Sequence, residues 1–205
     1  MHQRWSTYAA VVLALGLAAP ALAHVPGTHH GISNFDEVAP NIYRGATPSD
    51  ADIASLQKLG VKTIVDLRLR HSRLEEREAK SCGIEWVHLP MGYFAPSDKS
   101  VRKALQILEN APRVPVFIHC KQGADRTGTV VALYRVLVQD WSFDRAYKEM
   151  REHHFKPWWF TLRERVETAS EDPDAARLNV LSDTSTGMKL PIHPRILEDV
   201  FSYNN

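Results

Sequence analysis

The chain has 205 residues, 44% of them apolar, which is enough to bury one compact core with extensions at its ends. Its 25 basic and 24 acidic residues nearly balance, which argues against a nucleic-acid-binding protein, because such a protein needs a basic surplus to neutralise phosphates. The two cysteines, Cys82 and Cys120, are too few for a disulfide scaffold and lack the spacing of a zinc site.

Residues 1–23 have the pattern of a secretory signal peptide. The basic segment MHQRWST precedes the apolar stretch YAAVVLALGLAAP, which is too short to span a bilayer comfortably. Ala21, Leu22 and Ala23 form a small-x-small cleavage site, which predicts a mature chain starting near His24; an uncleaved anchor is the alternative. The mature chain has no other apolar run of membrane-span length, so we expect an exported protein with no membrane span.

Strand and helix patterns then alternate along the chain. Residues 24–33 are a polar leader that we expect to be loop. In chain order, the expected elements are a strand over 41–45, a helix over 50–59 capped by Ser49, a strand over 61–67, a helix over 73–82, a strand over 84–90, a helix over 101–110, a strand over 114–120, and helices over 127–138, 142–155 and 158–169. From residue 170 to residue 205, Asp, Pro, Ser and Thr predict a loosely packed tail.

This alternation predicts a single α/β domain over residues 34–169 with a mostly parallel sheet. In such sheets, ligands bind at the carboxyl ends of the strands, where loops meet the N-termini of helices. The segment HCKQGADRTG, residues 119–128, follows the last expected strand and leads into a helix. It therefore lies where the fold predicts a binding site.

The loop from Cys120 to Asp125 has the features of an oxyanion cradle. Its backbone N–H groups are expected to converge at the positive end of the helix, and Gly123 permits the tight backbone conformation that this needs. The same field favours the thiolate of Cys120 at neutral pH, and Arg126 supplies paired donors for two oxygens of a bound group. The pattern indicates a thiolate that attacks phosphorus.

Two further classes of binding loop, and a purely structural turn, fit this segment less well. Gly123 and Gly128 have the spacing of a nucleotide-binding P-loop, but Thr129 and Val130 stand where Lys and Ser or Thr are required. A sulfurtransferase loop is shorter by one residue. A structural turn with an incidental cysteine requires six specified residues to coincide by chance.

The segment HCKQGADRTG carries the H-C-x5-R-T pattern, and the chain resembles cysteine-dependent protein tyrosine and dual-specificity phosphatases. Together with IYRGATP, LGVKTIVDLR and VALYRVLVQDW, it is similar to the small exported bacterial dual-specificity-like phosphatases over about residues 34–155. The resemblance implies a sheet of four or five strands flanked by helices, no metal or cofactor, and a two-step reaction through a phosphocysteine. From the predicted signal peptide we expect a periplasmic location.

The resemblance also implies roles for individual residues. Cys120 matches the nucleophile, Arg126 the phosphate-binding arginine, Thr127 the hydroxyl that eases departure of the thiolate, and His119 a residue that supports the loop. The phosphate-binding loop itself comprises Lys121, Gln122, Gly123, Ala124, Asp125 and Arg126. The W-P-D loop of the larger tyrosine phosphatases is absent, and Gln122 does not take the role of their separate catalytic glutamine.

Two aspartates are candidates for the general acid that protonates the leaving group. The loop MGYFAPSDKS places Asp98 where the family carries its acid, and we take Asp98 as the acid; its alternative role, with Ser97, is to cap the following helix. Asp125 precedes Arg126 in a C-x4-D-R-T arrangement seen in some lipid phosphatases, and its alternative role is to pair with a nearby cation.

We expect the substrate to be a protein phosphorylated on tyrosine, serine or threonine, or another anionic phosphomonoester. Lys121 favours strongly anionic substrates, and the alternative is a phosphatase of phosphatidylinositol phosphates or inositol polyphosphates. A non-catalytic module that binds phosphorylated ligands is the alternative from another class. We expect a monomer. A reversible disulfide between Cys82 and Cys120 is a further hypothesis. Arg68, Arg70 or Arg73 could line the substrate mouth, and the alternative is a solvated or salt-bridged start of the following helix.

Overall fold

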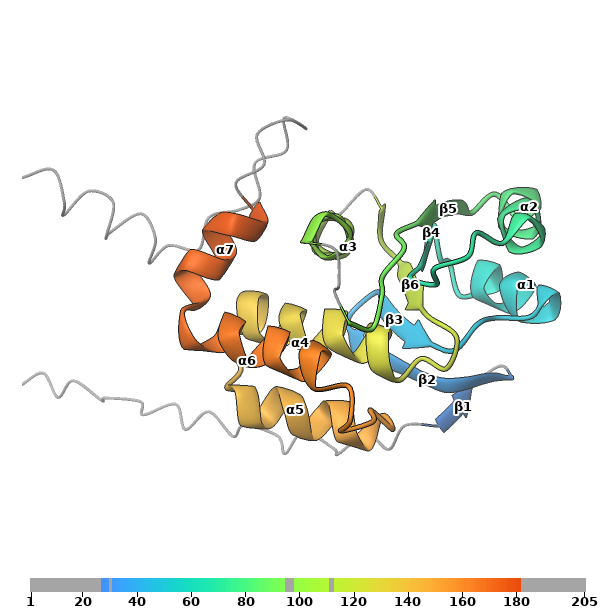
Figure 1. The fold of residues 1–205 in the computed structure, drawn as a ribbon. Coiled ribbons are helices and arrows are strands. Elements are labelled where there is room, and N and C mark those ends of the chain that lie inside the picture. The colour runs from blue at the N-terminus through green and yellow to red at the C-terminus, as the bar shows by residue number, and fades with distance from the viewer. Residues whose placement is uncertain (1–26, 30, 95–97, 111–112, 182–205) are drawn as a thin grey trace, which may run out of the picture.

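The structure is a computed structural model that describes residues 27–29, 31–94, 98–110 and 113–181 (Figure 1). One sheet has the strand order β1-β2-β3-β6-β4-β5. Strands β3, β6, β4 and β5 are parallel, whereas β1, β2 and β3 pair antiparallel. The strands are β1 (Gly27–His29), β2 (Ile32–Ala39), β3 (Ile42–Gly45), β4 (Thr63–Asp66), β5 (Glu85–His88) and β6 (Val116–His119).

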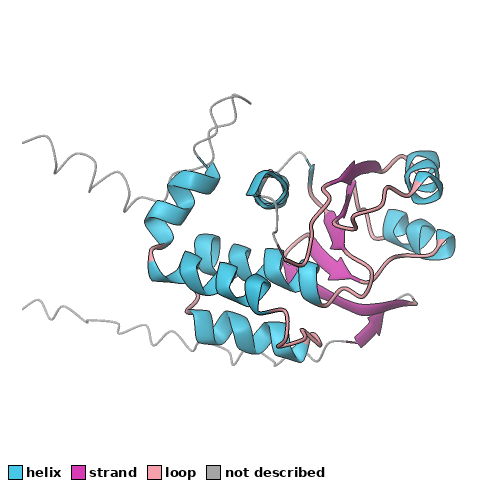
Figure 2. Cartoon of the chain, in the orientation of Figure 1, coloured by secondary structure: helices cyan, strands magenta, loops and turns pink. Residues whose placement is uncertain are grey.

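Helices cover both faces of this sheet (Figures 1 and 2). The α1–α2 pair lies on one face, and α3 to α6 lie on the other, with α7 packed against α3 and α4. The fold is therefore the α/β class that the sequence predicts, with a mostly parallel sheet. The helices are α1 (Asp50–Lys58), α2 (Arg73–Ser81), α3 (Asp98–Glu109), α4 (Asp125–Gln139), α5 (Phe143–Glu152), α6 (Phe160–Glu171) and α7 (Pro173–Leu181).

Alternating side chains of the central strands fill the two cores. Ile118 of β6 and Val65 of β4 face the layer of α3 to α6, whereas Phe117 and Ile64 face α1 and α2. Because successive side chains of a strand point to opposite faces, strands covered on both sides must be apolar throughout, as these are. The central strands are thereby held firmly, and their carboxyl ends form one edge of the sheet.

Local signals in the sequence set where several helices begin. Ser49 caps α1 by accepting a hydrogen bond from the backbone N–H of Asp52, and the Asp52 carboxylate accepts one from the backbone N–H of Ser49 in return. Ser142 caps α5 in the same position. The expected caps at these two serines are confirmed.

The two ends of the domain differ from the expectation. The leader expected over 24–33 contains β1, and β2 begins at Ile32, so the sheet starts earlier than predicted. The segment from residue 170 onward, expected to be a loosely packed tail, contains the last residues of α6 and the whole of α7. The Arg177 side chain of α7 is buried. The expected signal peptide and residues 182–205 lie outside the described residues. Among the described residues, no helix has the length and apolar character needed to cross a membrane.

The topology argues against a disulfide between the two cysteines. Both are free; Cys82 precedes β5, whereas Cys120 follows β6. Parallel strands of four residues, about 13 Å long, separate these two edges of the sheet, and a disulfide requires Cα atoms within about 7 Å. The disulfide hypothesis is therefore wrong for this fold.

Candidate active site

The phosphate-binding loop predicted from the sequence connects β6 to α4. Cys120 is the first residue after β6 and is 2% exposed, and Asp125 is the first residue of α4. The backbone N–H of Gly128 donates to the carbonyl of Ala124, which begins the helical hydrogen bonding. Strand, loop and helix thus follow one another as expected, with the loop at the positive end of the helix dipole.

The loop carbonyls are hydrogen-bonded to donors outside the loop. Thr47 donates from Oγ1 to the Cys120 carbonyl at 3.0 Å and from its backbone N–H to the Lys121 carbonyl at 3.3 Å. Asn34 Nδ2 lies 3.4 Å from the carbonyl of Gln122, and Arg44 Nη2 lies 2.8 Å from that of Gly123. Within the described residues, no acceptor binds the backbone N–H groups of residues 121–126. These donors remain for an anion, as in a backbone nest.

Gly123 cannot be replaced by a larger residue without a clash. Its φ of +68° lies in the left-handed region, and a Cβ atom there would lie 2.4 Å from the carbonyl carbon of Gly45. The loop backbone therefore packs directly on the end of β3. The glycine predicted from the motif serves both the conformation and this close contact.

Arg126 extends beside the loop with part of its guanidinium unpaired. Nη2 donates to the Tyr93 hydroxyl at 2.9 Å, and the guanidinium carbon lies 4.5 Å from the centre of the Tyr93 ring. The ring stacks on Trp159 at 4.1 Å. Nε of Arg126 is buried and has no partner among the described residues. A buried donor without an acceptor is unfavourable, which makes this nitrogen available to a phosphate oxygen.

Thr127 lies in the first turn of α4 and is fully buried. Its Oγ1 has no hydrogen-bond partner among the described residues, Cys120 included. The hydroxyl is therefore free to donate a hydrogen bond to another group. The role expected for Thr127 stays a prediction.

A second cation lies beneath the loop. Arg44 of β3 is 1% exposed, and Gly128 leaves room for its guanidinium, because a Cβ at Gly128 would lie 3.6 Å from Nη2. Burial lowers the pKa of Arg44 to about 10, against the attraction of Glu149 and Asp36, so it remains charged at neutral pH. The loop thus has fixed positive charge on its inner side, which favours an anion above it.

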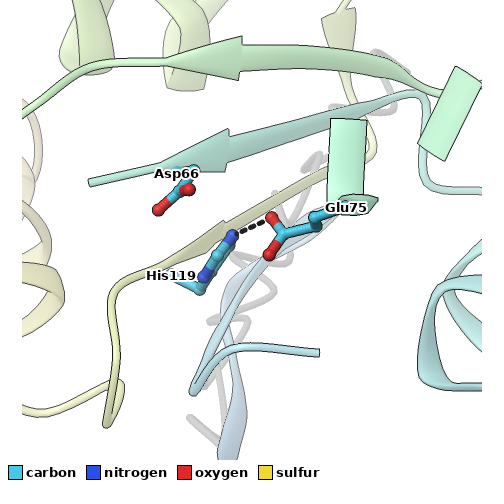
Figure 3. A group of neighbouring side chains, drawn as sticks. All are labelled: Asp66, Glu75 and His119. Carbon is cyan, nitrogen blue, oxygen red and sulfur yellow. Dashed lines mark hydrogen bonds and ion pairs between the residues drawn. The ribbon is translucent and has the colours of Figure 1, made fainter. Parts of the chain in front are cut away.

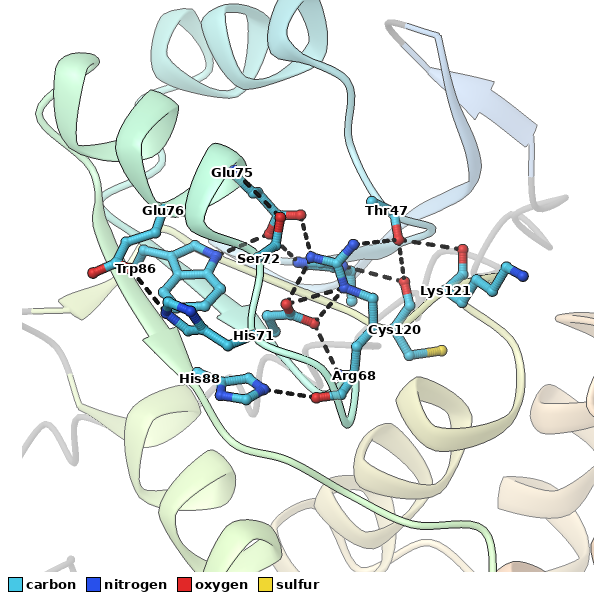
Figure 4. Close-up of polar contacts among 12 residues, drawn as sticks. Thr47, Arg68, His71, Ser72, Glu75, Glu76, Trp86, His88, Cys120 and Lys121 are labelled. Carbon is cyan, nitrogen blue, oxygen red and sulfur yellow. Dashed lines mark hydrogen bonds and ion pairs between the residues drawn. The ribbon is translucent and has the colours of Figure 1, made fainter.

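Behind the loop lies a network of buried charged groups (Figures 3 and 4). His119 contacts the Glu75 carboxylate through Nε2 at 2.9 Å and the Cys120 carbonyl through Nδ1 at 3.2 Å. Trp86 Nε1 donates to the same Glu75 oxygen at 2.9 Å. Figure 4 shows the Cys120 carbonyl directed at Thr47 and its sulfur directed away from it.

The trio of Asp66, Glu75 and His119 has the composition of a metal site, with ligand atoms within 4.8 Å of one another (Figure 3). Arg68, however, pairs with both carboxylates, with Nη2 2.7 Å from Asp66 Oδ2 and 2.5 Å from Glu75 Oε2. These oxygens already bind a cation, so we interpret the trio as part of an ion-pair network. Of the two roles considered for Arg68, the salt bridge is the one observed.

The two candidate acids differ in their surroundings. Asp125 is 2% exposed; its Oδ1 accepts from the backbone N–H of Lys156 at 3.0 Å, and its Oδ2 accepts from Lys156 Nζ at 3.1 Å. Asp98 is the first residue of α3, and its side chain lies outside the described part of the structure.

Two further residues of the predicted phosphate-binding loop are exposed. The Lys121 side chain has no hydrogen bond or ion pair in the described part of the chain, and Gln122 accepts a hydrogen bond from Lys156 Nζ.

Several supporting residues escape prediction from the sequence. Glu75 belongs to a segment that carries no phosphatase motif. Thr47 and Tyr93 lie in the segments IYRGATP and MGYFAPSDKS, but nothing in those segments indicates that the two side chains contact Cys120 and Arg126. Arg44 gives a weak signal, since a charged residue inside an apolar strand must find a buried partner. His153, near the end of α5, is also buried, and its ring contacts Asp36 and Asn34.

A buried cysteine in a loop of unpaired N–H groups, followed by an arginine at the start of the central helix of an α/β sheet, defines the class of cysteine-dependent phosphatases. The family model for "DSP-PTPase phosphatase fused to NAD+ Kinase" matches residues 18–164. The chain belongs to this dual-specificity phosphatase family.

Individual relatives agree with this classification. The dual-specificity protein phosphatase TpbA of Pseudomonas aeruginosa is 36% identical over 123 residues, which are 60% of this chain and 55% of TpbA, so the match spans about half of that relative. The TpbA crystal structure aligns with a TM-score of 0.64 at 30% identity, covering 75% of this chain and 93% of that one. The catalytic core of SIW14 from S. cerevisiae aligns with a TM-score of 0.63 at 26% identity, covering 79% and 97%.

Proposed function

We propose that the protein is an exported phosphomonoester hydrolase in which Cys120 carries the phosphoryl group as a phosphocysteine. The observation that carries this proposal is the loop itself. Its carbonyls are bound from outside, its N–H groups are unpaired, and Arg126 Nε is a buried donor without a partner among the described residues. Such a cradle stabilises a trigonal, strongly anionic phosphoryl group more than it stabilises the substrate. Membership of the family gives further support.

The reaction runs in two displacements. The Cys120 thiolate attacks phosphorus, the bond from phosphorus to the ester oxygen breaks, and the leaving oxygen takes a proton from Asp98. Water then attacks phosphorus and gives its proton to the Asp98 carboxylate, while the bond between sulfur and phosphorus breaks and inorganic phosphate is released. The Thr127 hydroxyl donates to the departing thiolate in this second step, and Arg126 holds two phosphoryl oxygens throughout.

The substrate class we propose is a phosphorylated protein, with tyrosine phosphate included. TpbA is named a dual-specificity protein phosphatase, and one TpbA structure contains phosphotyrosine. A second candidate is an inositol polyphosphate or phosphoinositide. It is favoured by the exposed Lys121 beside the nucleophile and by SIW14, which is named a PP-IP phosphatase. The ratio of kcat/KM on a phosphotyrosine peptide to kcat/KM on an inositol polyphosphate decides between them.

The mechanism is tested by comparing Cys120→Ser with Cys82→Ser. Removing the nucleophile should lower turnover of an aryl phosphate by at least about 10³-fold, because the remaining groups only bind phosphate. Cys82 lies at the other edge of the sheet, so Cys82→Ser should keep wild-type turnover and should yield a phosphorylated Cys120 peptide after acid quenching.

An active Cys120→Ser protein would contradict the mechanism. A wild-type protein that binds phosphate without turnover would instead be a non-catalytic module for phosphorylated ligands. Export is tested separately, by sequencing the N-terminus of the protein from cells, which should begin near His24.

A further inference from the structure

Four ionisable side chains lie buried or half-buried directly behind Cys120. Asp66 and Glu75 are carboxylates, Arg68 is a permanent cation, and His119 contacts both Glu75 and Cys120 (Figure 4). Asp66 and His119 are fully buried. An unbalanced charge in such surroundings is strongly unfavourable. Two carboxylates and one guanidinium leave one negative charge, and a protonated His119 neutralises it.

The hydrogen bonds of His119 also require that its ring be protonated on both nitrogens. Nε2 faces a Glu75 carboxylate oxygen and Nδ1 faces the Cys120 carbonyl, and both of these oxygens are acceptors. Each ring nitrogen must therefore donate, and a ring that donates from both nitrogens is the imidazolium. Burial raises the pKa of Glu75, but the hydrogen bond and charge of His119, followed by Trp86 and Arg68, bring it below its ordinary value. The histidine thus faces a carboxylate that stays ionised.

We propose that Glu75 is a positioning residue that holds His119 as an imidazolium against the Cys120 carbonyl and so keeps a positive charge beside the nucleophile. The inference rests on the proposed function, in which Cys120 is the nucleophile. A fixed cation beside a cysteine favours its thiolate, so Glu75 acts on the reaction through His119 without touching the substrate.

Each element around His119 contributes a group to its electrostatic surroundings. Asp66 ends β4, and Arg68 follows in the next loop and binds both carboxylates. His88 ends β5 and contacts the Arg68 carbonyl through Nε2 at 2.7 Å. On β3, Arg44 interacts electrostatically with Cys120 from beneath the loop. Of these groups, only Glu75 hydrogen-bonds the His119 ring through its side chain, so its replacement changes that ring most directly.

The chain offers a matched pair of variants, Glu75→Gln and Glu76→Gln. Both replace a carboxylate by an amide in the first turn of α2, but Glu76 pairs with His71 and Lys80 near the surface. The readout is the alkylation rate of Cys120 by iodoacetamide between pH 5 and pH 9, measured by mass spectrometry of its peptide so that Cys82 does not contribute. Glu75 stays ionised throughout this range, because its pKa lies below the ordinary value of 4.5.

We expect Glu75→Gln to slow alkylation at pH 6 about tenfold and to approach the wild-type rate at pH 9, because a missing cation only shifts the pH at which the thiolate forms. Glu76→Gln should follow the wild type at every pH. The value of kcat/KM on an aryl phosphate should show the same pH-dependent loss. An equal loss at all pH values, or no loss at pH 6, overturns the proposal, because damaged packing has no such pH dependence.

A measurement on the wild-type protein decides the matter if Glu75→Gln does not fold. The ¹⁵N chemical shifts of the His119 ring should show both nitrogens protonated at pH 7, and a neutral ring at pH 7 overturns the proposal. If the wild type hydrolyses no phosphomonoester but the alkylation profiles still differ, the proposed function fails while the positioning role of Glu75 stands.

Discussion

At the scale of single residues, the surroundings of Asp125 bear on the choice of general acid. Both of its oxygens accept hydrogen bonds from Lys156, one of them from the charged Nζ. Both oxygens of this buried carboxylate are thus already engaged by Lys156, and neither is directed at a leaving group. The pairing with a cation, considered as the alternative role of Asp125, is the one observed. Asp98 therefore remains the preferred acid.

Leaving groups distinguish the two aspartates. Asp98→Asn should barely slow hydrolysis of an aryl phosphate whose phenoxide is stable without a proton, and should slow an alkyl phosphate by about 10²-fold or more. Asp125→Asn should slow both substrates by similar factors, because it disturbs the contact with Lys156 instead of removing a proton. Steady-state kinetics on the two substrates measures this. The assignment to Asp98 is wrong if the dependence on leaving group appears in Asp125→Asn alone.

The site residues that can be predicted from the sequence are those that lie next to one another along the chain. Cys120, Gly123 and Arg126 belong to one continuous segment, the loop after β6 and the start of α4, so local chemistry alone indicates an anion cradle. Glu75 and Thr47 reach the loop from α2 and from the segment after β3, and neither has a neighbour in the sequence that reveals its partner. Such side chains act by tertiary contact, which a single sequence does not encode locally.

At the scale of elements, the strands and helices that agree with prediction are those with clear periodicity or clear ends. Strand β1 escapes prediction because its three polar residues carry no periodicity. Helix α7 escapes prediction because an Asp-Pro pair in a polar segment also favours a tail. Asp172 in fact caps the helix by accepting from the backbone N–H of Ala175, and Pro173 stands at the first helical position, where proline is favoured.

The loop between β6 and α4 depends on a glycine at one position, which Gly123→Ala tests. This variant forces a Cβ to within 2.4 Å of the Gly45 carbonyl carbon, in addition to the strain of a positive φ. The matched control is Gly83→Ala, because Gly83 has a similar φ of +71° but nothing within 4 Å of the added atom. The control should lower the free energy of unfolding by about 1–2 kcal/mol and leave activity unchanged.

Gly123→Ala should lower the free energy of unfolding by more than the control does, and should also lower kcat/KM on an aryl phosphate, because the cradle must shift away from β3. Urea unfolding and steady-state kinetics measure the two effects. Equal losses of stability in the two variants would show that the contact with Gly45 has no effect.

At the scale of the whole molecule, α4 links the site to the far side of the domain. Its first residues close the phosphate loop, and its 15 residues extend about 22 Å to an end that α7 covers. Arg177 of α7 makes this contact: its Nε donates to the Leu137 carbonyl at 2.7 Å, and its other nitrogens pair with Asp140 and Asp174. The candidate active site and the contacts that hold α7 to α4 thus lie at opposite ends of α4.

This separation predicts that Arg177→Ala lowers stability without lowering activity. The variant leaves the buried Leu137 carbonyl without its donor, which should lower the free energy of unfolding by about 1–3 kcal/mol. Lys80→Ala, which removes an exposed pair with Glu76, is the control and should leave stability nearly unchanged. Urea unfolding measures the loss, and kcat/KM below the unfolding transition should match the wild type. A fall in kcat/KM would mean that displacement of the far end of α4 reaches the phosphate loop, and the two ends would then not be independent.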